Sequence, residues 1–139
     1  MLLVSGGGSE SGTSAQAYED QVRATDTTLT REVREVAARA AQGGSLDARV
    51  ERNIQVRDAV RRAAARLSAL KPPANVARDH AVLVDGYRLL VEEYDDAIRA
   101  AQHGDAAALA RVDRRFANGQ SASAQQVHRA SARIEAALT

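Results

Sequence analysis

The chain has 139 residues, the usual length of one domain, and its 45% hydrophobic but only 3% aromatic residues leave the packing to alanine, valine and leucine. Such an alanine-rich composition favours helices. A formal net charge of +1 argues against a nucleic-acid partner, which usually requires a concentrated basic face, and the lack of cysteine excludes disulfides, thiolate metal sites and cysteine lipidation in the chain as given.

Residues 1–13 differ in composition from the rest of the chain. A short apolar run at 2–4 leads into a Gly/Ser-rich stretch of the kind that forms flexible tethers. The apolar run is far shorter than the roughly 20 residues that cross a bilayer. We therefore predict a flexible tether over 1–13 and no transmembrane span.

The first helix is predicted over about residues 14–41. Its apolar side chains recur at three- and four-residue spacing, from Tyr18 to Val36, and so form one stripe on one face. Gly43 and Gly44 follow, and glycine readily adopts the left-handed conformation that ends a helix. These two glycines predict the first turn between helices.

The second helix is predicted over 46–70. Ser45 or Asp47 can accept hydrogen bonds from the free amides of its first turn. Pro72 and Pro73 must end it, because proline lacks the amide donor and disfavours helical geometry in the residue before it.

The third helix, predicted over 74–102, has the clearest pattern. Pro73 opens it, and His103 with Gly104 closes it. Its inward positions alternate by four and three residues: Val76, His80, Leu83, Tyr87, Leu90, Tyr94, Ala97 and Ala101.

A fourth helix is predicted over 105–138. Asn118 and Gly119 interrupt its pattern, and glycine in a helix interior costs about 1 kcal/mol relative to alanine. We favour one continuous but bent helix here over two short helices. Four helices of similar length joined by short turns predict an all-α, antiparallel up-down-up-down four-helix bundle over 14–139.

Two segments resemble a known family. Residues 2–7 (Leu-Leu-Val-Ser-Gly-Gly), and residues 67–73 (Leu-Ser-Ala-Leu-Lys-Pro-Pro) followed by His80, resemble small, poorly characterised secreted proteins and lipoproteins of actinobacterial type. Leaders of that family end in a leucine-rich run, a lipobox cysteine and a Gly/Ser tether, and here glycine stands in the place of the cysteine. The resemblance implies that 1–13 is a leader remnant with its tether, and that the bundle lies outside the cytoplasm, near the cell envelope. The alternative is a cytosolic protein with a disordered start.

The candidate ligand-binding residues are His80, Tyr87 and Tyr94. They are seven residues apart, so they share one stripe of the third helix and could line a small-molecule pocket between helices. In the competing interpretation they are core residues whose polar ends find partners at the edge of the bundle.

No catalytic residue, metal site or cofactor is predicted. Di-iron bundles need a Glu-x-x-His pair on each of two helices, and no histidine of this chain has glutamate three residues before it. The serines lack a nucleophile elbow, and the glycines at 6–8 lack the lysine and helix of a phosphate-binding loop. We therefore expect a protein that is not an enzyme.

Three functions are compatible with the sequence. The first is a non-catalytic, extracytoplasmic helical-bundle module that binds a protein or small-molecule partner and lies close to a membrane. The second is a bundle that binds a small ligand or cofactor at the His80, Tyr87 and Tyr94 stripe. The third is a cytosolic oligomerisation or regulatory partner that uses an unfilled apolar row.

Overall fold

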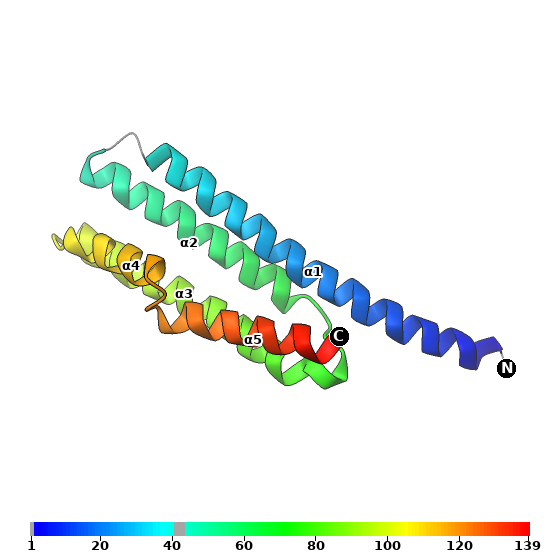
Figure 1. Cartoon of the computed structure of the whole chain (residues 1–139). Coiled ribbons are helices and arrows are strands. Elements are labelled where there is room, and N and C mark those ends of the chain that lie inside the picture. Colours follow the sequence, from blue (N-terminus) through cyan, green and yellow to red (C-terminus); the bar gives the residue numbers. More distant parts are fainter. Residues whose placement is uncertain (1, 41–43) are drawn as a thin grey trace.

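The computed structural model describes the backbone of residues 2–40 and 44–139, and the side chains of 14–39 and 44–139. All regular secondary structure in these residues is helical, which confirms the predicted all-α class (Figure 1). The elements are α1 (Leu2–Ala40), α2 (Leu46–Ser68), the short 3-10 helix η1 (Ala74–Val76), α3 (Ala77–Gln102), α4 (Ala107–Ala117) and α5 (Ala122–Leu138).

Helix α1 begins at Leu2 and not near Ser14. The backbone of 2–13, predicted as a flexible tether, is therefore assigned to the helix. Glycine lowers helix stability but does not forbid helical dihedral angles, so a Gly/Ser-rich composition alone does not fix where a helix starts. The side chains of 1–13 lie outside the described residues, as does Gly43, the predicted end signal of this helix.

The boundaries of α2 and α3 follow local signals. Ser45 is the N-cap of α2, and its hydroxyl accepts a hydrogen bond from the Ala48 amide at 3.3 Å. The two prolines separate α2 from η1. At the end of α3, Gly104 has a φ of +108°, and Nδ1 of the His103 ring lies 2.7 Å from the Arg99 carbonyl oxygen.

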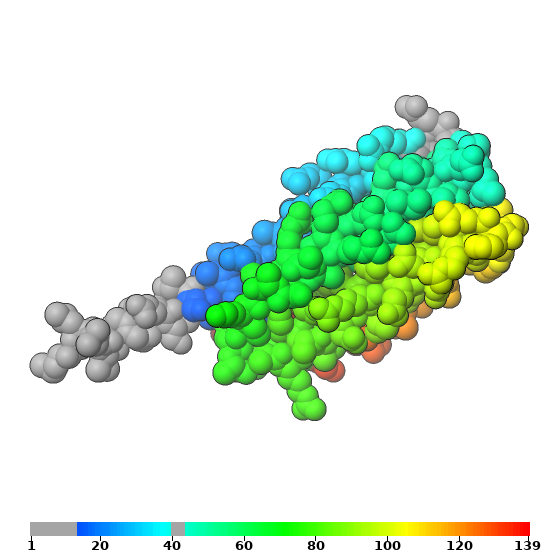
Figure 2. Space-filling view, turned by 180° about the vertical axis from the view of Figure 1, so that it is seen from behind, coloured from blue at the N-terminus to red at the C-terminus, as the bar shows by residue number. Residues whose placement is uncertain are grey.

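Helix α3 lies at the centre of the core. It packs against α2, α4, α5 and η1, whereas α1 packs along α2 and only sparsely against α5. Figure 2 shows the face on which α2 and α3 lie side by side. Among the described side chains, the largest fully buried ones come from every element except α1: Val60, Leu67, Val76, Leu83, Leu109, Val112 and Ile134. The continuous apolar stripe of α3 explains its central place.

The prediction of one bent helix over 105–138 is wrong. Helix α4 ends at Ala117, and α5 begins at Ala122. Between them Gly119 has a φ of +67°, a conformation that glycine adopts without strain. Ser121 then caps α5, because its hydroxyl accepts from the Ala124 amide at 3.2 Å.

A buried polar cluster holds this break in place. The Ser121 and Ser123 hydroxyls donate to the two carboxylate oxygens of Glu93 on α3, at 3.0 and 2.6 Å. Both serines are buried. The first turn of α5 contains no acidic residue, so Glu93 supplies the negative charge that a helix N-terminus favours.

Candidate functional site

The structure does not bring His80, Tyr87 and Tyr94 into one site. Their exposed fractions are 7%, 3% and 3%, so all three are buried in the core. Only Tyr87 borders the large groove described below. The shared stripe predicted from the sequence is real, but its members face different surroundings.

His80 is paired with Tyr18 of α1. The Tyr18 hydroxyl lies 2.8 Å from His80 Nδ1, and the two rings meet edge to face with centroids 5.5 Å apart. Burial raises the pKa of Tyr18 to about 12, with a further contribution from the charge of Asp79, so Tyr18 stays a hydrogen-bond donor. The contact joins α1 to α3.

Burial lowers the pKa of His80, although a hydrogen bond to the Leu67 backbone acts in the opposite direction. The ring is therefore neutral near pH 7. With Nδ1 accepting from Tyr18, Nε2 is the nitrogen left to donate to Leu67. Both ring nitrogens are used, so His80 fits the core interpretation and not the ligand-binding one.

Tyr94 lies on the part of α3 near α4. Burial raises its pKa, and the negative charges of Asp113 and Glu93 raise it further. Asn53 of α2 is also buried, and its Oδ1 has no hydrogen-bond partner among the described residues. No large cavity among the described residues includes Tyr94, so it carries no ligand-site assignment.

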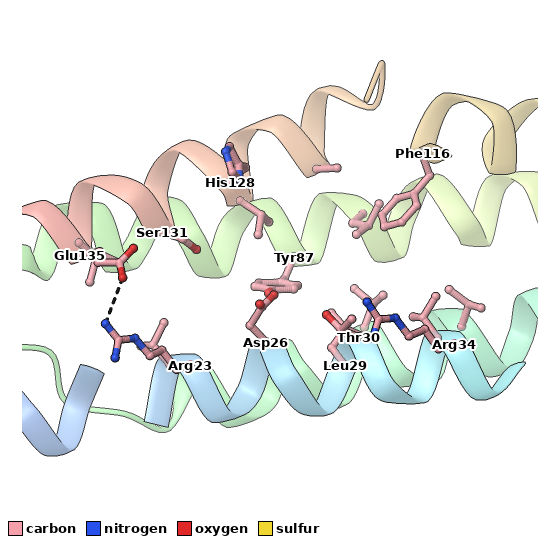
Figure 3. A pocket seen from close by; sticks show the side chains of 18 of the residues that line it. Arg23, Asp26, Leu29, Thr30, Arg34, Tyr87, Phe116, His128, Ser131 and Glu135 are labelled. Atoms are coloured by element: carbon pink, nitrogen blue, oxygen red, sulfur yellow. Dashed lines mark hydrogen bonds and ion pairs between the residues drawn. The ribbon is translucent and has the colours of Figure 1, made fainter. Parts of the chain in front are cut away.

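A groove of about 670 Å³ runs between α1 and α5 (Figure 3). Its base is formed by α2 and α3, and Phe116 of α4 stands at one end. Its apolar lining consists of Val22, Leu29, Val33, Val56, Val60, Tyr87, Leu90, Phe116, Ala124, Val127 and Ile134. The polar residues that border it are Glu19, Arg23, Asp26, Thr30, Arg34, His128, Ser131 and Glu135. We call this feature the α1–α5 groove.

An ion pair spans the groove near one end. Arg23 of α1 lies 3.0 Å from Glu135 of α5 and also pairs with Glu19 (Figure 3). The Arg23 and Glu135 side chains are more than half exposed, so water screens their attraction and the pair contributes little to stability. It does fix the positions of the charges at this end.

The Tyr87 side chain is buried and borders the α1–α5 groove. Burial raises the pKa of Tyr87, and the charge of Asp26 raises it further, so the hydroxyl stays protonated. Figure 3 shows Asp26 extending from α1 toward Tyr87. A ligand in the groove would therefore meet one phenol donor on an otherwise apolar base.

The sequence patterns did not predict the residues of α1 and α5 that line the groove as site residues. The signal that could have indicated them is small side chains on α5, at Ala124 and Ser131, where a fully packed core would carry large ones. These positions leave space opposite Val22, Leu29 and Val33, which are only half-buried.

Comparison with protein-family models, with curated proteins and with solved structures found no match to this chain. Within the described residues, no group of three or more histidine and acidic side chains could hold a metal ion. None of the helices in that part of the chain is long and apolar enough to cross a membrane.

Proposed function

We propose that this protein is a non-catalytic binding module and that the α1–α5 groove is its ligand site. The volume of about 670 Å³ carries the proposal, because small-molecule sites typically occupy about 300–1,000 Å³. The lining has the usual character of such sites, mostly apolar side chains with a few polar groups that orient the ligand. Of the three predicted residues, only Tyr87 belongs to this site.

The proposed architecture is an antiparallel up-down-up-down four-helix bundle in which α4 and α5 together take the fourth position. The short connections between successive helices support it. So do two contacts between neighbouring helices: Asn75 donates to the Ala137 carbonyl at 3.4 Å, and Arg39 donates to Gln55 at 3.2 Å.

The third hypothesis, an oligomerisation partner, has less support. The exposed large hydrophobic side chains of the described residues are Leu46, Leu89 and Phe116, one on each of α2, α3 and α4. Single exposed apolar residues are ordinary on monomer surfaces and do not mark an interface. Phe116 has a place in the groove instead.

We also propose, on the resemblance of residues 2–7 and 67–73 alone, that the protein works outside the cytoplasm. Fractionation of the native cells followed by intact-mass measurement checks this. We expect an extracytoplasmic chain that begins near Gly6 or later. A chain in the cytosol that begins at Met1 would contradict the proposed location and leave the groove proposal untouched.

Blocking the groove tests the proposed function. Ser131 is half-buried in the wall formed by α5, so Ser131→Trp would fill part of the groove. Ala132 is exposed and does not line the groove, so Ala132→Trp adds the same side chain elsewhere and is the matched control. The probe is Nile red, a neutral apolar dye whose fluorescence rises in apolar surroundings.

We expect Nile red to bind the unmodified protein with one site per chain. The Ser131→Trp variant should bind it at least about tenfold more weakly, equivalent to about 1.4 kcal/mol of lost binding free energy. The Ala132→Trp variant should bind as the unmodified protein does. Absence of saturable binding, or equal binding by the two variants, would refute the proposed function.

A further inference from the structure

We infer that the α1–α5 groove binds a single-chain amphiphile, whose hydrocarbon chain lies along the groove and whose acidic head group contacts Arg34. The inference rests on the proposed function, since it names the ligand class of the same groove. It depends on three observations: the length of the groove, the continuity of its apolar lining, and the uneven distribution of charge along it.

The groove is long. Along α1 its lining extends from Glu19 to Arg34, which is about 22 Å at about 1.5 Å per residue. One linear hydrocarbon chain can lie along a groove of this length.

Apolar side chains line the groove over its whole length. Val22 and Ile134 lie toward the end with the Arg23–Glu135 ion pair, and Phe116 lies at the other end. A hydrocarbon chain would therefore leave water along its full length, and each methylene removed from water favours binding. The Phe116 side chain is 40% exposed, which is a large fraction for an aromatic residue, and a ligand beneath the ring would reduce it.

The charges along the groove disfavour an acidic group everywhere except at Arg34. At one end, the two carboxylates of Glu19 and Glu135 share a single guanidinium, that of Arg23. In the middle, Asp26 has no cationic partner among the described residues, and its charge acts on Tyr87. An anion at either place would meet uncompensated negative charge.

Arg34 is the remaining arginine of the groove lining. It makes no ion pair within the described residues. Its side chain extends from α1 at the end of the groove where Phe116 lies (Figure 3). A guanidinium presents parallel N–H donors that match a carboxylate. An acidic head group at Arg34 therefore places the chain of the ligand over Tyr87 and toward the Arg23 end.

The experiment compares three ligands that share one chain and differ in head group: dodecanoate, dodecanol and dodecylammonium. Each displaces Nile red from the protein at concentrations below micelle formation and at a pH where the carboxylate is ionised. The variant is Arg34→Gln. The control is Arg31→Gln, since Arg31 also lies exposed on α1 but pairs with Glu35 and does not line the groove.

We expect dodecanoate to displace the dye at about fivefold lower concentration than dodecanol, because a partly exposed ion pair adds up to about that factor. Dodecylammonium should bind more weakly than dodecanoate. Arg34→Gln should remove the preference for dodecanoate over dodecanol, and Arg31→Gln should keep it.

Two results would overturn the inference and leave the proposed function in place, provided that Nile red binds and Ser131→Trp weakens its binding as expected. One is failure of all three ligands to displace the dye, which would exclude a single-chain ligand. The other concerns the head group. If the unmodified protein does not prefer dodecanoate over dodecanol, or if Arg34→Gln keeps that preference, the acidic head group does not contact Arg34. Failure of Nile red to bind would instead refute the proposed function itself.

Discussion

The His80 ring joins α3 to two other helices, to α1 through Tyr18 and to α2 through the Leu67 backbone. Tyr18 lies 2.8 Å from Nδ1, and the Leu67 backbone is bonded to the ring as well. A neutral imidazole satisfies both partners, whereas a protonated one would present a second donor to the Tyr18 hydroxyl in a buried place. The folded protein therefore favours the neutral form, as the lowered pKa of His80 indicates.

The neutral His80 ring predicts a specific pH dependence of stability. In the unfolded chain the histidine takes up a proton near its ordinary pKa of 6.5, but in the folded protein only at lower pH. Below pH 6.5 the unfolded state thus binds more protons, so the free energy of unfolding falls as pH falls, by at most about 1.4 kcal/mol per pH unit. Urea unfolding between about pH 7.5 and about pH 5.5 measures this slope.

Two variants assign the slope to His80. His80→Gln should flatten it, whatever its effect on stability at pH 7.5, because the titrating group is gone. His103→Gln should keep it, since that ring is exposed at the end of α3. A slope that survives in His80→Gln would show that another group is responsible.

The residue-scale prediction from sequence was partly successful, for a physical reason. A seven-residue spacing shows that His80, Tyr87 and Tyr94 point inward, and all three are buried. It does not show what they face. Because α3 is surrounded by several helices, His80 meets α1, Tyr87 meets the groove, and Tyr94 lies near α4. Assigning neighbours requires the packing of the other helices, which periodicity within one helix does not contain.

At the scale of elements, Gly86 sets how closely α3 and α5 approach each other. A Cβ atom at Gly86 would lie 2.9 Å from Val127 Cγ2 and 3.2 Å from the Val127 backbone nitrogen. Beside this contact, the Gln126 side chain donates to the Val82 carbonyl at 3.0 Å. The two backbones are therefore positioned by a residue without a side chain, in a helix where alanine would otherwise be preferred.

Gly86→Ala tests this close approach. In an open helix the substitution would stabilise the protein by about 1 kcal/mol. Here we expect it to destabilise the protein by about 1–2 kcal/mol, because the added methyl group forces α5 away from α3. Chemical denaturation measures the difference.

Val127→Ala provides the matched background, because it removes the methyl group that the new Cβ would meet. In that background Gly86→Ala should cost about 1 kcal/mol less than in the unmodified chain. A stabilised Gly86→Ala variant, or equal costs in the two backgrounds, would show that the helices can separate freely at this point.

Helix boundaries were predictable where one local signal decides them. Ser45, the two prolines and Gly104 mark ends that the structure shows. The sequence pattern at Gly119 predicted a bend and not a break. The break is stabilised by Glu93 of α3, which accepts hydrogen bonds from Ser121 and Ser123. Local sequence signals do not predict a contact between residues so far apart in the chain.

At the scale of the whole molecule, the α1–α5 groove follows from unequal packing around α3. Helix α1 packs well on α2 and sparsely on α5, and the small side chains of Ala124 and Ser131 leave the space between them unfilled. The sequence indicates an apolar stripe on each helix. It does not indicate that the stripes of α1 and α5 fail to pack closely against each other. That mismatch between neighbours is what creates the proposed binding site.

Two-dimensional amide NMR of labelled protein titrated with dodecanoate tests most directly whether the α1–α5 groove takes a single-chain ligand. We expect the amide signals of groove residues, among them Thr30, Tyr87 and Ser131, to shift with saturation. Signals of Arg66 and Arg88, exposed on α2 and α3 outside the groove, should stay in place. Shifts that occur only outside the groove, or none at all, would mean that the groove does not bind a single-chain ligand.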